Sequence, residues 1–125
     1  MWENIEMKEL IKRAKKEYEN INKIFCPYFK NYVYLTKKGF NHLIGNRFGK
    51  RDDDIILERL NSIRYIKQIV SNSGTLQEYE NSDTQYFGFI AIISRKKYKV
   101  IILKDNGIYK FISIIPQYKT GTKER

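Results

Sequence analysis

The only histidine of the chain, His42, lies in a segment with positive charges and no negative ones. Between Tyr28 and Arg51 there are six Lys or Arg residues and no Asp or Glu. The pKa of an imidazole lies near neutrality, so it can both accept and donate a proton at physiological pH. Surrounding cations would attract a polyanion. His42 is therefore a candidate proton-transfer residue facing a polyanion, and the alternative is a solvated surface histidine.

Other residues could complete such a site. Cleaving RNA without a metal ion needs a base for the 2′-hydroxyl, an acid for the leaving 5′-oxygen, and cations or donors on the phosphorane oxygens. Arginine suits the last role because it binds phosphate oxygens through two parallel hydrogen bonds. The candidate catalytic residues are His42, Arg47, Ser113, Tyr118 and Lys119, and the candidate nucleic-acid-binding residues are Lys37, Lys38, Lys50, Arg51 and Lys110.

Signatures of other enzyme classes do not occur in the sequence. There is no nucleophile elbow, phosphate-binding loop or dinucleotide fingerprint. The single cysteine, Cys26, gives neither a disulfide framework nor the spacing of a zinc site, and we expect it to be a small buried hydrophobic residue. The run Asp52–Asp54 suits the start of a helix, with a magnesium site as the alternative. We expect no cofactor and no bound metal.

The charge is distributed unevenly over the 125 residues, whose formal net charge is +10. Residues 84–125 carry nine Lys or Arg against two acids. Drift in an AT-rich coding sequence would spread lysine evenly, so this pattern favours a basic face for an anionic partner such as nucleic acid. The ten tyrosines could stack on single-stranded bases, although most should pack in a sheet.

Localisation follows from what the sequence lacks. No apolar run approaches the ~20 residues that span a bilayer, and the N-terminus lacks the apolar core of a signal peptide. A lone cysteine fits a reducing compartment. We expect a protein without membrane contacts that acts in the cytoplasm, or is delivered into the cytoplasm of a target cell.

The first half of the chain shows helical periodicity. Apolar residues at steps of three and four predict a helix over 4–24, which Pro27 would separate from a short strand at 32–36. Thr36 is a suitable N-cap for a helix that reaches about Asn46. On a helical wheel Phe40, Leu43, Ile44 and Arg47 cluster, so His42 should lie off the core face. A third helix is predicted over 53–71.

From Thr75 the pattern changes to alternation and continuous apolar runs, which are typical of strands. It predicts strands at 75–80, 85–94, 97–104 and 108–115, the last two joined by a tight turn at Asp105-Asn-Gly107. The predicted fold is α+β, with the N-terminal helices on one face of a four-stranded antiparallel meander. Residues 1–119 would form a single domain, followed by a polar tail at 120–125.

The order of these elements resembles the phage-associated branch of the barnase–EndoU–colicin–RelE-like nucleases. Such proteins have a helix bearing a histidine followed by Leu or Ile, then a second helix and a four-stranded sheet. The last strand of that sheet ends in a Ser/Thr-x-x-Pro-like stretch. The matching segments here are Thr36–Leu43, Ile55–Val70 and Phe111–Pro116.

The resemblance implies a metal-independent endoribonuclease, toxin-like or encoded by a mobile element, that leaves a 2′,3′-cyclic phosphate. His42 would be the acid/base residue and Ser113 the last-strand hydroxyl. The family often has a second histidine where this chain has Arg47, so Tyr118 or Lys119 would be the second proton-transfer group. A toxin of this kind would have an acidic inhibitor or immunity protein. The alternatives are a non-catalytic nucleic-acid-binding module and an interaction protein whose basicity is compositional.

Overall fold

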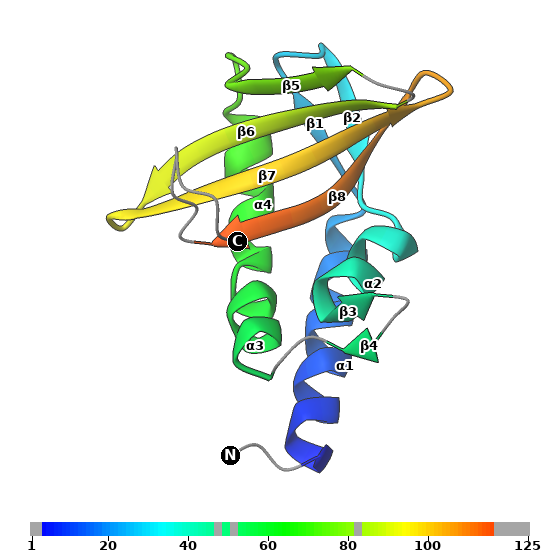
Figure 1. Ribbon diagram of the computed structural model, residues 1–125, viewed down its shortest axis with the longest axis vertical. Helices are drawn as coiled ribbons and strands as arrows, with labels where there is room; N and C mark the ends of the chain where they lie inside the picture. Colours follow the sequence, from blue (N-terminus) through cyan, green and yellow to red (C-terminus); the bar gives the residue numbers. More distant parts are fainter. Residues whose placement is uncertain (1–3, 47–48, 51–52, 82–83, 117–125) are drawn as a thin grey trace.

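A computed structural model describes residues 4–46, 49–50, 53–81 and 84–116, and Figure 1 shows their arrangement. Within these ranges there are four helices and eight strands. In chain order they are α1 (Asn4–Ile21), β1 (Lys23–Cys26), β2 (Asn31–Tyr34), α2 (Lys37–Ile44), β3 (Gly45–Asn46), β4 (Gly49–Lys50), α3 (Asp53–Asn61), α4 (Ile63–Ser71), β5 (Glu78–Asn81), β6 (Gln85–Ile93), β7 (Lys96–Asp105) and β8 (Ile108–Pro116). The predicted tail at 120–125 lies outside the described residues.

The main sheet has six strands in the order β1-β2-β8-β7-β6-β5. Adjacent strands in this sheet are antiparallel, except for β2 and β8, which run parallel to each other. The α+β prediction is confirmed, but the four-stranded antiparallel meander is wrong. The hairpin β1–β2 extends the sheet beyond β8 and makes it mixed.

Two predicted helices have different limits in the structure. The helix predicted over 4–24 ends at Ile21, because Asn22 adopts a left-handed φ of 64° and directs the chain into β1. The helix predicted over 53–71 is divided at Ser62, whose hydroxyl donates to the carbonyl oxygen of Glu58 at 2.9 Å. None of the helices in the described ranges is long and apolar enough to cross a bilayer.

The two faces of the main sheet differ sharply in exposure. Helix α4 crosses one face, behind the strands in Figure 1, and contacts β1, β6 and β7. Buried side chains of this covered face include Phe87, Phe89, Val100, Ile102 and Phe111. The alternate residues of the strands form what we call the open face, where side chains are partly or fully exposed: Lys23, Phe25, Tyr32, Tyr34, Tyr86, Lys99, Ile101, Leu103 and Lys110.

Cys26 is completely buried in β1, as the sequence predicts, with its sulfur 3.9 Å from the carbonyl oxygen of Ser73. Burial raises the pKa of its thiol.

A thiol reagent should therefore react far more slowly with Cys26 in the native protein than with Cys26 in the protein unfolded in urea. Rapid labelling of the native protein would contradict this burial. Above about pH 8.5 the thiol ionises in the unfolded protein but stays protonated in the native protein. The free energy of unfolding should therefore fall as the pH rises above this value, because ionisation then favours the unfolded state.

Candidate functional site

Helix α2 presents His42 beside the sheet. The hydroxyl of Thr36 accepts a hydrogen bond from the backbone N–H of Gly39 at 3.2 Å, which confirms the predicted N-cap. Phe40 and Leu43 are buried, whereas His42 is half-exposed. The predicted position of His42 off the core face is therefore confirmed.

The position of α2 is fixed by a close approach to β8 at Gly39. A Cβ atom on this residue would lie 2.5 Å from the carbonyl oxygen of Phe111 and 2.7 Å from the hydroxyl oxygen of Tyr18. That hydroxyl donates to the carbonyl oxygen of Thr36 at 2.7 Å. Burial raises the pKa of Tyr18, so it stays a neutral donor. These contacts hold the helix, and with it His42, against the edge of β8.

His42 lines a groove of about 470 Å³ between α2 and the open face. The β5–β6 hairpin contributes Glu80 and Tyr86 to the same groove, and β7 contributes Lys99. Apolar side chains such as Ile101 form part of its lining. An imidazole, a carboxylate, a phenol and an ammonium group, drawn from separate elements, thus meet in one open cavity.

Lys99 forms an ion pair with Glu78 across the sheet, and both side chains also line the groove. Gly88 is opposite Glu78 on β5 and Ile101 on β7, so Lys99 reaches Glu78 diagonally across the space that a side chain at Gly88 would fill. A Cβ there would lie 2.9 Å from Cε of Lys99 and 3.2 Å from Cβ of Glu78. The side chain of Lys99 is only 16% exposed, so the ammonium is held close to the sheet.

Two further predicted cations lie on α2, the helix that carries His42. Lys37 and Lys38 are exposed in the first turn of this helix. Lys38 precedes His42 by four residues, so the two side chains project from the same face of the helix. A phosphate bound there would meet this lysine and the backbone N–H groups of the helix start. In the described part of the chain, no three His, Cys, Asp or Glu side chains gather closely enough to hold a metal ion.

Ser113 does not line the groove. It is 2% exposed, and its hydroxyl accepts a hydrogen bond from Nη1 of Arg59 at 2.8 Å. The same Arg59 nitrogen donates to the carbonyl oxygen of Ile114 at 3.3 Å. This arrangement ties α3 to the end of β8. Sequence reasoning did not identify Arg59, because only the folded chain brings residues 54 positions apart into contact.

Replacement of Arg59 by methionine should lower the free energy of unfolding by about 1–3 kcal/mol, because it leaves the buried Ser113 hydroxyl without its charged donor. Arg64→Met is the matched control, since Arg64 is exposed on α4, and its cost should be small. Denaturant titration of both variants measures the difference. Equal stability of the two variants would show that this hydrogen bond is energetically unimportant.

Of the remaining predicted site residues, Lys110 has a described side chain, and it does not line the His42 groove. Lys110 lies on the open face beside β2 and forms an exposed ion pair with Asp105 at 3.2 Å. Lys50 pairs through its backbone with Gly45 in the two-stranded sheet β3–β4. Of the predicted site residues, His42 is the one that lines the groove in the described part of the chain. Arg47, Arg51, Tyr118 and Lys119 lie outside the described residues.

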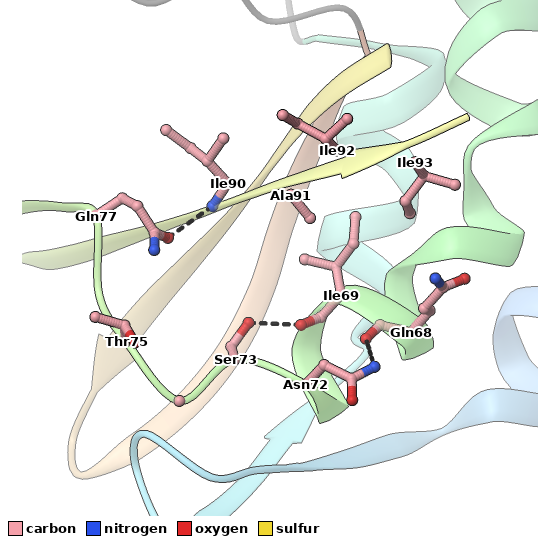
Figure 2. A pocket seen from close by; sticks show the side chains of 11 residues that line it. Gln68, Ile69, Asn72, Ser73, Thr75, Gln77, Ile90, Ala91, Ile92 and Ile93 are labelled. Carbon is pink, nitrogen blue, oxygen red and sulfur yellow. Dashed lines mark hydrogen bonds between the residues drawn. The ribbon is translucent and has the colours of Figure 1, made fainter. Parts of the chain in front are cut away.

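Another groove, shown in Figure 2, has a different character. It lies between the end of α4 and the edge of β6 and is lined by no Asp, Glu, His, Lys, Arg, Cys or Tyr. The carbonyl oxygen of the Gln77 side chain accepts a hydrogen bond from the backbone N–H of Ile90 at 2.8 Å, and the Ser73 hydroxyl donates to the Ile69 carbonyl oxygen at 2.5 Å. Polar side chains of this groove thus form hydrogen bonds with backbone groups. The His42 groove, which contains titratable side chains, is therefore the better candidate for a catalytic site.

No protein-family model, curated protein or solved structure matches this chain. The resemblance of residues 34–116 to a nuclease superfamily therefore stays a prediction. Three residues of the His42 groove that sequence reasoning missed are Glu78, Glu80 and Lys99. Glu78 and Glu80 are two residues apart, so both side chains lie on one face of their strand. No feature of the neighbouring sequence indicates that this face lies near α2.

Proposed function

We propose that the protein is a metal-independent endoribonuclease that cleaves RNA through attack by the 2′-hydroxyl. The observation that carries the proposal is the shared groove of His42, Glu80 and Lys99 on the open face. Imidazole and carboxylate groups transfer protons near neutral pH, and an ammonium group stabilises negative charge on phosphorus-bound oxygens. The groove therefore contains the three kinds of group that the reaction needs.

The roles can be assigned so that atoms and charges balance. The Glu80 carboxylate takes the proton of the 2′-hydroxyl, and the 2′-oxygen forms a bond to phosphorus. The bond from phosphorus to the 5′-oxygen breaks, and protonated His42 gives its proton to that oxygen. The products are a 2′,3′-cyclic phosphate and a 5′-hydroxyl. Lys99 stabilises the phosphorane charge, while Lys37 and Lys38 hold the neighbouring phosphates.

Ser113 is proposed to act indirectly in this scheme, through Arg59 and the end of β8. Arg47, Lys50 and Arg51 follow α2 in the sequence and are proposed to bind phosphate, and Tyr118 and Lys119 remain proposed contributors after β8. A toxin-like or mobile-element nuclease of this kind would be inhibited by an acidic protein that covers its basic face. It would act on RNA in the cytoplasm of its own cell or of a target cell.

Labelled single-stranded RNA incubated with the protein in excess EDTA tests the proposal. We expect cleavage in EDTA, and a Glu80→Gln variant should cleave roughly 100-fold more slowly or worse. Glu9→Gln, an exposed position on α1, is the matched control and should cleave like the wild type. Salt-sensitive binding without cleavage would instead identify a nucleic-acid-binding module. Absence of both at low salt would reject both functions.

A further inference from the structure

The two strands of the β1–β2 hairpin carry three exposed aromatic side chains at the edge of the sheet opposite to β5, and a fourth, Tyr28, lies in the turn between them. Phe25, Tyr32 and Tyr34 are 48%, 41% and 39% exposed. The register pairs Phe25 with Tyr32 and Lys23 with Tyr34, so all four side chains belong to the open face. The core contacts of the hairpin come from the alternate residues Ile24, Cys26 and Val33, which are buried. Packing in the core therefore does not explain these three rings.

Two of the three rings, Phe25 and Tyr32, are held in a defined arrangement. Phe25 and Tyr32 meet edge to face, with centroids 5.6 Å apart and planes inclined at 80°. Nζ of Lys23 lies 4.5 Å from the centroid of the Tyr32 ring. Edge-to-face and cation–π contacts restrict the rings without removing them from solvent. Such a cluster is a preorganised surface for stacking a flat ligand.

A cationic groove adjoins the hairpin and shares one residue with it. The groove, of about 500 Å³, lies between α1, β1 and α4 and is lined by Arg13, Lys16, Lys23 and Lys67. All four side chains are exposed, and Glu17 is the one acid among the lining residues. Lys23 thus belongs both to the groove and to the aromatic cluster. Four cations against one acid favour a negatively charged ligand.

We propose that this cluster and groove form a binding site for single-stranded nucleic acid, separate from the His42 groove. Unpaired bases would stack on Phe25, Tyr32 and Tyr34, while phosphates would follow the cations. An acidic polypeptide would satisfy the cations but make no use of three exposed rings, and a duplex keeps its bases stacked away from them. The aromatic cluster lies on β1 and β2 at one edge of the sheet, whereas the sheet residues that line the His42 groove come from β5, β6, β7 and β8. The existence of this binding site does not depend on cleavage.

Fluorescence anisotropy with labelled single-stranded oligo-dT tests the site, because DNA lacks the 2′-hydroxyl and its binding reports on the site without RNA cleavage. We expect Tyr32→Leu and Phe25→Leu each to weaken binding roughly tenfold, and Tyr32→Phe, which keeps the ring, to bind like the wild type. Lys16→Gln should make the slope of log affinity against log salt shallower by about 0.7, whereas Lys8→Gln on the same helix should not.

Two controls make the result decisive. Ile92→Ala removes another exposed apolar side chain and should leave the affinity unchanged. Thermal unfolding of each variant separates loss of the site from loss of the fold. Affinity that is insensitive to loss of the rings, or equal competition by poly-glutamate or duplex DNA, would overturn the proposal in favour of a general polyanion surface. Failure to bind oligo-dT at low salt would overturn it outright, whether or not the protein cleaves RNA.

Discussion

Replacement of His42 by alanine should reduce RNA cleavage by roughly 10²–10⁴-fold, because loss of a positioned proton donor removes the general acid step. The free energy of unfolding should change by about 1 kcal/mol or less, since the side chain is half-exposed and the core contacts of α2 come from Phe40 and Leu43. Single-turnover cleavage in EDTA and denaturant titration measure the two effects separately.

Asn41→Ala provides the control for this variant. Asn41 is the preceding residue of the same helix, is exposed, and does not line the groove. Its replacement should leave the cleavage rate unchanged. Full activity of the His42→Ala variant would remove His42 from the site, and an equal loss in both variants would mean that α2, not the imidazole, was disturbed.

Gly39→Ala should lower the stability of the protein. Its Cβ would approach the Phe111 carbonyl oxygen to 2.5 Å, and this atom cannot retreat unless β8 moves. Overpacking of this kind costs roughly 1–3 kcal/mol, while the higher helix propensity of alanine returns only about 1 kcal/mol. We therefore expect a net loss measured by thermal or denaturant unfolding. Cleavage should fall as well, because α2 must move away from β8 and carry His42 with it.

Gly74→Ala is the matched control for that substitution. A Cβ at Gly74 would meet no other atom within 4 Å, and the residue is exposed. Alanine there should stabilise the protein by about 0.4–1 kcal/mol, because it restricts the unfolded chain. If both substitutions had the same effect, the close approach of α2 to β8 would be wrong.

Local signals in the sequence predicted the elements whose causes are local. The Thr36 cap, the helix that follows it and the turn at Asp105–Gly107 all depend on neighbouring residues, and the structure contains each of them. The segment Lys23–Cys26 was assigned partly to a helix because it is short and continues an apolar stripe. Its place in the sheet depends on pairing with β2, and β2 in turn pairs with the distant β8.

The candidate site could be predicted only in part for the same reason. Helical phase was sufficient to place His42 off the core. Its partners Glu80 and Lys99 come from strands whose register is set by long-range pairing, so their proximity was not readable from the sequence. The cationic groove beside α1 was not readable from the sequence either, because its cations Arg13, Lys16, Lys23 and Lys67 come from more than one element.

The most direct test of the proposed reaction uses a DNA oligonucleotide that contains a single ribonucleotide, incubated with the protein in excess EDTA. Mass spectrometry of the fragments identifies the position of cleavage and the new ends. We expect cleavage only on the 3′ side of the ribonucleotide, leaving a 2′,3′-cyclic phosphate and a 5′-hydroxyl, and cleavage roughly 10²–10⁴-fold slower with the His42→Ala variant. Cleavage at deoxynucleotides, or fragments with a 5′-phosphate, would contradict attack by the 2′-hydroxyl.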